Sequence, residues 1–304
     1  MSLNTRIVAG LAAVTIIFGT SWMANKIVVE SIPPITTAAL RLLLGASCLF
    51  IGVKAQRLSI PRERSFYRAV GAIALLSFSI PFVLTNWGLR YVPSGLAAVM
   101  YATMPFWVAL FSRMFVAKHS LNVWTKLSLV VGFLGVVIIL GENVSLREVK
   151  SVWGILAVLT STAIQAFSLI AVKIEGDRYS STVMNFVAMA FSGIVLLVVS
   201  LLLEPGATVQ LNQRVLLWLI YLSLFGNGIV FVVYFWLVKF VEPVLLSMVS
   251  FVTPVLAVAV GVFALNESLG LQVLIGAFFV LAGIVLANGP GLRRLLAGRQ
   301  VVSQ

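Results

Sequence analysis

Charged side chains are scarce in this sequence, since only 10% of its 304 residues are Asp, Glu, Lys or Arg. A soluble domain has about 25% charged and about 45–50% apolar residues, whereas 61% of this chain is hydrophobic. This composition excludes a water-soluble globular enzyme. It also argues against a transmembrane β-barrel, because barrel strands alternate apolar and polar residues and the apolar runs here are continuous.

Cysteine and histidine occur once each, as Cys48 and His119. A single cysteine excludes an intramolecular disulfide, and one Cys with one His cannot supply the usual ligand set of a zinc site. We therefore predict no metal site and no cofactor. A Cys–His nucleophile pair is not expected either, because Cys48 lies in an apolar run and His119 lies in a connecting segment.

Long apolar runs take up most of the chain. A helix that crosses a bilayer needs about 20 apolar residues, and charges or turn residues divide this sequence into ten runs of about that length. We therefore predict an all-α integral membrane protein with ten transmembrane helices in the lipid bilayer. The predicted helices cover residues 7–28, 34–53, 66–89, 94–116, 123–140, 152–172, 182–203, 214–237, 243–265 and 271–289.

The net charge of +12 is explained by how Lys and Arg are distributed between the two sides of the membrane. With the N-terminus in the cytoplasm, 15 Lys and Arg residues fall in cytoplasmic segments and five in outer segments, while Arg41 lies within a helix. Lys and Arg accumulate in the cytoplasmic loops of membrane proteins. We therefore expect both termini to be cytoplasmic and expect no nucleic-acid partner. The sequence leaves the oligomeric state open, with a monomer among the options.

The chain also contains an internal repeat at offsets of 147 to 149 residues. WGLRYVPSGLAAVMYATMP (87–105) aligns with WLVKFVEPVLLSMVSFVTP (236–254), and SLVVGFLG (128–135) aligns with GAFFVLAG (276–283). We predict two repeats, over residues 1–145 and 146–304. Because each repeat has five helices, the two must cross the membrane in opposite orientations. Inverted repeats are typical of secondary transporters, whose substrate site lies near the midplane between the halves.

Three segments together resemble the EamA family of the drug/metabolite transporter superfamily. They are FGTSWMANKIVVESIPPITTAALRLLLGA (18–46), VPSGLAAVMYATMP (92–105) and NESLGLQVLIGAFFVLAGIVL (266–286). The resemblance extends over nearly the whole chain. It departs at KHSL (118–121), where the family often has an acidic residue, so that His119 stands opposite Glu267. The resemblance implies a ten-helix metabolite exporter of the bacterial inner membrane.

Acidic residues are the rarer charged group, with nine Asp and Glu against 21 Lys and Arg. None of the nine lies at the centre of a predicted helix. Proton-driven transporters commonly use acids inside the membrane, because protonation removes a charge that is costly to bury. Their scarcity here favours facilitated diffusion or exchange over proton coupling.

Arg41 lies well inside a predicted helix, about 10 Å from its start at 1.5 Å per residue. A guanidinium at that depth needs a partner or contact with water. Arg41 is therefore a candidate anchor for a substrate carboxylate or phosphate. The alternatives are that its side chain extends to the outer head groups or pairs with Glu30.

Polar and aromatic side chains inside the predicted helices are candidate substrate-binding groups, since amides in hydrocarbon must find partners or line water. Three pairs each share one helix face and are predicted to converge on one cavity. These pairs are Trp22 with Asn25, Gln165 with Ser168, and Asn227 with Tyr234. The full predicted substrate-binding set is Trp22, Asn25, Arg41, Asn86, Tyr101, Gln165, Ser168, Asn227 and Tyr234. Interhelical hydrogen bonding or an interfacial aromatic belt is the alternative role for each.

Helix-breaking residues lie at corresponding places in the two predicted repeats. Pro81 interrupts the third predicted helix, and GNG (226–228) interrupts the eighth. Paired interruptions of this kind indicate a transport site, although membrane helices also tolerate Pro and Gly without a functional role. Pro105 and Pro254 also correspond and are candidate hinges.

We predict a secondary transporter that exports small polar metabolites, with amino acids or related compounds as the preferred class. Its mechanism would be alternating access around a central cavity between the two repeats. The alternatives are an uncoupled channel-like facilitator or exchanger, an exporter of drugs or toxic compounds, and a nucleotide-sugar carrier. An intramembrane enzyme is a remote alternative, because the sequence has no His/Asp/Ser or paired-acid constellation. We therefore predict that the protein is not an enzyme.

Overall fold

The computed structural model describes residues 3–115, 123–141, 149–175, 179–241, 246, 249–265 and 270–296. These parts of the chain are helical apart from short connections, and no strand occurs among them. His119 and Glu267 lie outside the described residues.

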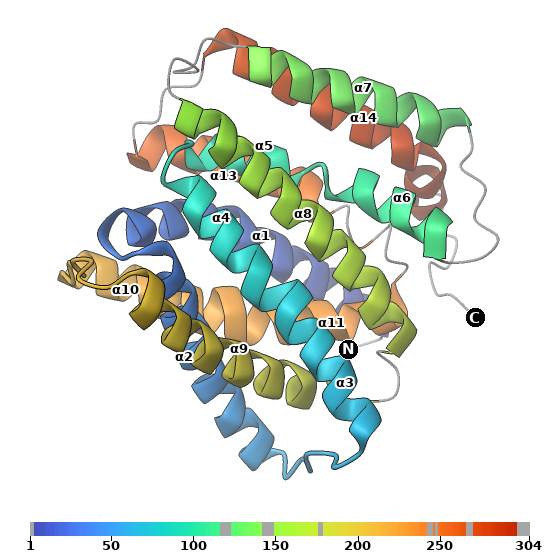
Figure 1. Ribbon diagram of the computed structural model, residues 1–304. Helices are drawn as coiled ribbons and strands as arrows, with labels where there is room; N and C mark the ends of the chain where they lie inside the picture. Colours follow the sequence, from blue (N-terminus) through green and yellow to red (C-terminus); the bar gives the residue numbers. More distant parts are fainter. Residues whose placement is uncertain are drawn as a thin grey trace.

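Helix lies at each of the ten predicted spans (Figure 1), so the all-α prediction is confirmed. The elements are α1 (Leu3–Ser31), α2 (Pro34–Ala55), α3 (Arg64–Ile73), η1 (Ala74–Ser79), α4 (Ile80–Leu89), α5 (Ser94–Tyr101), α6 (Met104–Phe115), α7 (Val123–Gly141), α8 (Val149–Glu175), α9 (Ser181–Leu203), α10 (Gln213–Tyr221), η2 (Leu222–Ile229), α11 (Val230–Phe240), α13 (Val249–Leu265) and α14 (Leu271–Leu296). Within the described residues, seven helical segments are long and apolar enough to cross a bilayer.

The fourth predicted span is not one continuous helix. α5 ends at Tyr101, and α6 begins after a two-residue turn. Pro105 has no backbone N–H to donate to the carbonyl of Tyr101. Within the turn, the Thr103 N–H and the Thr103 hydroxyl both donate to the Met100 carbonyl, at 3.2 and 2.7 Å. The corresponding Pro254 lies inside α13, so the two matched prolines have different effects on their helices.

Two π-helices, η1 and η2, interrupt the third and eighth predicted spans. Their first residues, Ala74 and Leu222, are 148 positions apart, which is the offset of the sequence repeat. Pro81 follows η1 and cannot donate to the carbonyl of Ser77. That carbonyl accepts instead from the side-chain amide of Gln165 at 3.3 Å. π-helical turns are frequent at functional sites, and both of these lie beside the cavity described below.

Helices that correspond under the repeat offset pack against each other. α2 packs on α9, and α7 packs along α14, as Figure 1 shows for the α7–α14 pair. Other contacts come in matched pairs: α4 with α8 corresponds to α1 with α11, and α2 with η2 corresponds to α9 with η1. The two halves of the chain are therefore interleaved.

Small residues bring α7 and α14 close together. A Cβ atom added to Gly135 would lie 2.6 Å from the Gly276 carbonyl oxygen, and one added to Gly283 would lie 2.6 Å from the Gly132 nitrogen. Helix association in membranes relies on this kind of close van der Waals packing, because lipid provides no hydrophobic driving force between helices.

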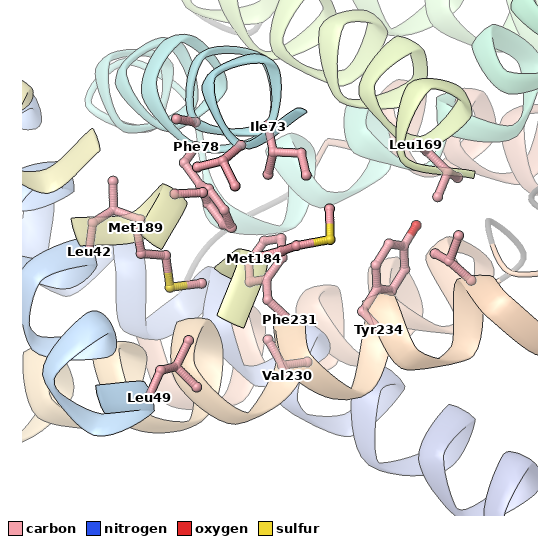
Figure 2. Packing of buried hydrophobic residues seen from close by; sticks show 14 of the residues in the cluster. Leu42, Leu49, Ile73, Phe78, Leu169, Met184, Met189, Val230, Phe231 and Tyr234 are labelled. Carbon is pink, nitrogen blue, oxygen red and sulfur yellow. The ribbon is translucent and has the colours of Figure 1, made fainter. Parts of the chain in front are cut away.

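Buried aromatic and sulfur-containing side chains from the two halves of the chain pack in one cluster (Figure 2). Phe78 of η1 packs edge-on against Phe231 of α11, with ring centroids 4.9 Å apart. Met184 and Met189 of α9 belong to the same buried cluster. The outward faces are also apolar, and Leu203 at the end of α9 is 70% exposed. An apolar exterior around a packed interior is what a lipid environment requires.

Candidate functional site

A cavity of about 110 Å³ lies at the junction of the two halves. Residues of α1, α2, α4 and α5 line it together with residues of α8, η2, α11 and α13. This space is somewhat smaller than the apolar cavity of about 150 Å³ that holds benzene, so it suits only a small organic molecule. Seven of the nine predicted substrate-binding residues line it, namely Trp22, Asn25, Arg41, Asn86, Tyr101, Gln165 and Tyr234.

Arg41 is only 6% exposed, although it lines the cavity. Its NH1 group donates to Asn25 Oδ1 and its NH2 group to Asn227 Oδ1, each at 2.8 Å. The guanidinium also lies 5.0 Å from the ring centroid of Phe82, within the range of a cation–π contact. Glu30 pairs with Lys26 at 3.4 Å, so the alternative of an Arg41–Glu30 pair is wrong.

The position of Arg41 beside the cavity depends on the first turn of α2, which is held in place at the start of the helix. Proline occupies the first turn of α2, where its missing N–H costs nothing. The Glu204 carboxylate, at the end of α9, accepts from the backbone N–H groups of Ile35 and Thr36, each at 2.9 Å. A carboxylate at a helix N-terminus satisfies free N–H groups and complements the helix dipole.

Two asparagines orient the guanidinium. Asn25 Nδ2 donates to Asn86 Oδ1 at 2.9 Å, and Asn86 Nδ2 donates to the Pro34 carbonyl at 3.0 Å. This chain of bonds directs Asn25 Oδ1 toward Arg41. It also ties α1, α2 and α4 together on one side of the cavity.

Some polar atoms at this corner lack partners. Arg41 Nε and Asn227 Nδ2 are buried and have no hydrogen-bond acceptor within the described part of the chain. Both are donors. Buried donors without acceptors are uncommon in native structures. Of these two residues only Arg41 lines the cavity, so its guanidinium is suited to a ligand that accepts hydrogen bonds.

Another part of the wall is formed by Tyr101 and Gln165. The Tyr101 hydroxyl donates to Gln165 Oε1, while Gln165 Nε2 donates to the carbonyl of η1 that Pro81 leaves free. Trp22 packs edge-on against Tyr101, with ring centroids 5.3 Å apart. Residues from both halves of the chain therefore contact each other directly at the cavity.

Ser168 and Asn227, also in the predicted set, do not line the cavity. The Ser168 hydroxyl is hydrogen-bonded to the hydroxyl of Ser77 and holds η1 against α8. Asn227 Oδ1 accepts a hydrogen bond from the NH2 group of Arg41. It does not share the cavity-lining face with Tyr234, because η2 widens the helical turn and shifts the seven-residue spacing.

Several lining residues were not predicted from the sequence. Phe18, Ser21, Phe82, Thr85 and Phe231 all contribute to the wall. Phe18 and Ser21 lie seven and four residues before Asn25, so helical periodicity extended backward from Asn25 would have found both.

The model of the EamA-like transporter family matches the chain twice, over residues 5–141 and 152–289. The chain belongs to the EamA-like transporter family. Membership of the drug/metabolite transporter superfamily follows from this. The two matches leave only a short connection between them.

Relatives of this EamA protein extend over most of its length. Uncharacterized transporter YoaV of Bacillus subtilis (strain 168) is 26% identical over 289 residues, which cover 95% of this chain and 99% of the relative. Uncharacterized inner membrane transporter YedA of Escherichia coli (strain K12) is 29% identical, covering 85% of this chain and 83% of the relative. One solved crystal structure has the same fold, with a TM-score of 0.71 at 20% identity over 96% of this chain and 99% of the other.

Family, relatives and apolar helices agree on a multi-pass membrane protein of the EamA type. The family and the names of these relatives indicate a membrane transporter rather than an enzyme. The cavity between the two halves is accordingly the candidate substrate site.

Proposed function

We propose that this EamA protein exports small polar metabolites across the bacterial inner membrane, with amino acids or related compounds as the preferred class. The observation that carries the proposal is the cavity between the two halves, whose wall combines one buried cation, several amides and aromatic rings from both halves. Such a mixture of apolar surface with a few placed polar groups is typical of small-molecule sites.

Alternating access between two inverted repeats, residues 1–145 and 146–304, is the proposed mechanism. The two family matches, the matched helix contacts and the π-helices 148 residues apart support this division. η1 and η2 each adjoin lining residues of the cavity, so bending at these two turns would move the halves around a fixed site. Both termini are proposed to be cytoplasmic, on the Lys and Arg distribution.

Transport is proposed to be uncoupled from protons, as facilitated diffusion or exchange. Among the described residues that line the cavity there is no Asp or Glu. A proton-coupled site would need a group that gains and loses charge during the cycle.

Flux into proteoliposomes tests the proposed function. Labelled amino acids should enter at a saturable rate, and unlabelled substrate inside the vesicles should accelerate that rate. A rate that rises linearly with concentration would indicate a channel-like facilitator. If a broad panel of amino acids and related metabolites does not move at all, the proposal is wrong.

A cavity-filling variant provides the matched comparison. Val249 lines the cavity, so Val249→Trp should fill much of its 110 Å³ and reduce flux at least tenfold. Leu203→Trp makes the same kind of change on the exposed end of α9 and should leave flux unchanged. Equal flux through the two variants would argue that substrate takes another path.

A further inference from the structure

The Arg41 corner of the cavity offers an excess of hydrogen-bond donors. A guanidinium has five N–H groups, and the Asn25 and Asn227 side-chain oxygens accept from two of its nitrogens. Arg41 Nε has no acceptor among the described residues; Asn227 Nδ2 has none either, but Asn227 contacts Arg41 without lining the cavity. The side-chain oxygens of Asn25, Asn86 and Asn227 are already engaged as acceptors. A group that only accepts hydrogen bonds, such as a carboxylate, complements this corner.

The positive charge of Arg41 in the cavity wall also favours a carboxylate. Arg41 is the only charged residue among the described residues that line the cavity. A buried charge without compensation is costly. A monoanion would neutralise Arg41, whereas an amine would double the positive charge and a phosphate dianion would leave excess negative charge. A zwitterion would leave the net charge of the site unchanged.

The rest of the wall is mainly apolar and aromatic. Phe18, Trp22, Phe82 and Phe231 all line the cavity. Phe82 also contacts the guanidinium face, which leaves the edge of the guanidinium, with its N–H groups, for bidentate binding. A ligand with one charged end and an apolar body fits both parts of this wall.

We propose that the substrate is a small monocarboxylate, whose carboxylate binds Arg41 and whose apolar part lies against these aromatic rings. This inference rests on the proposed function, since it assigns a substrate class to the same cavity. An amino acid is accepted through its carboxylate, and the ammonium group is not required.

Three probes of nearly equal shape test the proposal. Phenylacetate, phenylacetamide and phenethylamine differ at one end only, where they are anionic, neutral and cationic. Their binding to the purified full-length protein is measured by calorimetry. Bonds to a charged partner are stronger than neutral ones, so phenylacetate should bind about 10- to 100-fold more tightly than phenylacetamide. Equal binding of the amide or the amine, or no binding of phenylacetate at millimolar concentration, would overturn the proposal.

Variants at Arg41 separate the charge from the shape of the site. Arg41→Gln should weaken phenylacetate binding to the level of phenylacetamide while changing phenylacetamide binding less than about threefold. Arg41→Lys keeps the charge but loses the bidentate geometry, so its preference for the acid should be intermediate. Arg90→Gln is the matched control, because Arg90 donates to the Val29 carbonyl and does not line the cavity. A wild-type preference for the acid in Arg41→Gln would contradict the proposal.

Flux measurements distinguish this inference from the proposed function. If the protein transports amino acids and phenethylamine competes as well as phenylacetate, the carboxylate inference is wrong and the transport function stands. If phenylacetate binds in an Arg41-dependent manner but no solute crosses the bilayer, the transport proposal is wrong and the binding site stands.

Discussion

Replacement of Gly135 by alanine should destabilise the protein through the α7–α14 contact. The new Cβ would lie 2.6 Å from both the Gly276 oxygen and the Val280 nitrogen, whereas ordinary contact begins at 3.4 Å. The two helices would have to separate by about 0.8 Å, the difference between these distances. A gap of about 0.5–1 Å loses a quarter to a half of each van der Waals contact energy. Overpacking of this kind costs about 1–3 kcal/mol.

The thermal unfolding midpoint of the purified protein in detergent measures this cost. Gly135→Ala should lower the midpoint by roughly 2–12 °C, at about 2–4 °C per kcal/mol. Gly71→Ala is the matched control, because a Cβ at Gly71 of α3 meets no atom within 4 Å and alanine favours helix over glycine. Its midpoint should be unchanged or higher. If Gly135→Ala melts at the same temperature as Gly71→Ala, the close α7–α14 packing is not a source of stability.

Three other outcomes are expected. Glu204→Ala should lower stability by about 1–2 kcal/mol, because it removes the acceptor for two N–H groups at the start of α2. As the control, Glu30→Ala loses one largely exposed ion pair and should cost less than about 1 kcal/mol in the same thermal melt. Pro81→Ala restores a backbone N–H that competes with Gln165 for the Ser77 carbonyl. Proteoliposome flux should therefore fall, while the melting midpoint should stay the same or rise. Unchanged flux would argue against a role for η1 in transport. A potassium diffusion potential, negative inside the vesicle, should accelerate phenylacetate efflux; no effect of voltage would show that the carboxylate does not cross as an anion.

The positions of the helices could be predicted from the sequence because apolar runs of the right length are separated by charges. The places where a proline interrupts a helix were harder to predict. Pro105 and Pro254 occupy matching positions, yet one separates two helices and the other lies inside one. A proline determines which carbonyl loses its donor. It does not determine which local hydrogen bonds form around that carbonyl, such as those of Thr103 to the Met100 carbonyl.

Polar residues of the cavity were easier to predict than its apolar residues. An amide or guanidinium inside an apolar run must be explained by a partner or by water, so Asn25, Arg41 and Gln165 stood out. Phe231 lines the cavity, whereas Phe263 is 87% exposed on the outside. Both are phenylalanines in apolar helices, and hydropathy does not distinguish a ring facing lipid from one facing a substrate.

The proposed carboxylate substrate connects selectivity with the direction of transport. Moving one elementary charge across 100 mV changes its free energy by about 2.3 kcal/mol, which corresponds to a concentration ratio of about 50. A cell interior that is negative therefore drives a monocarboxylate outward without any coupling ion. Import of the same anion against that potential would need a coupled proton or cation, and the described cavity wall has no acid to bind one. A single buried cation in a wall without acids is thus consistent with all three parts of the proposal: a carboxylate substrate, uncoupled transport and export.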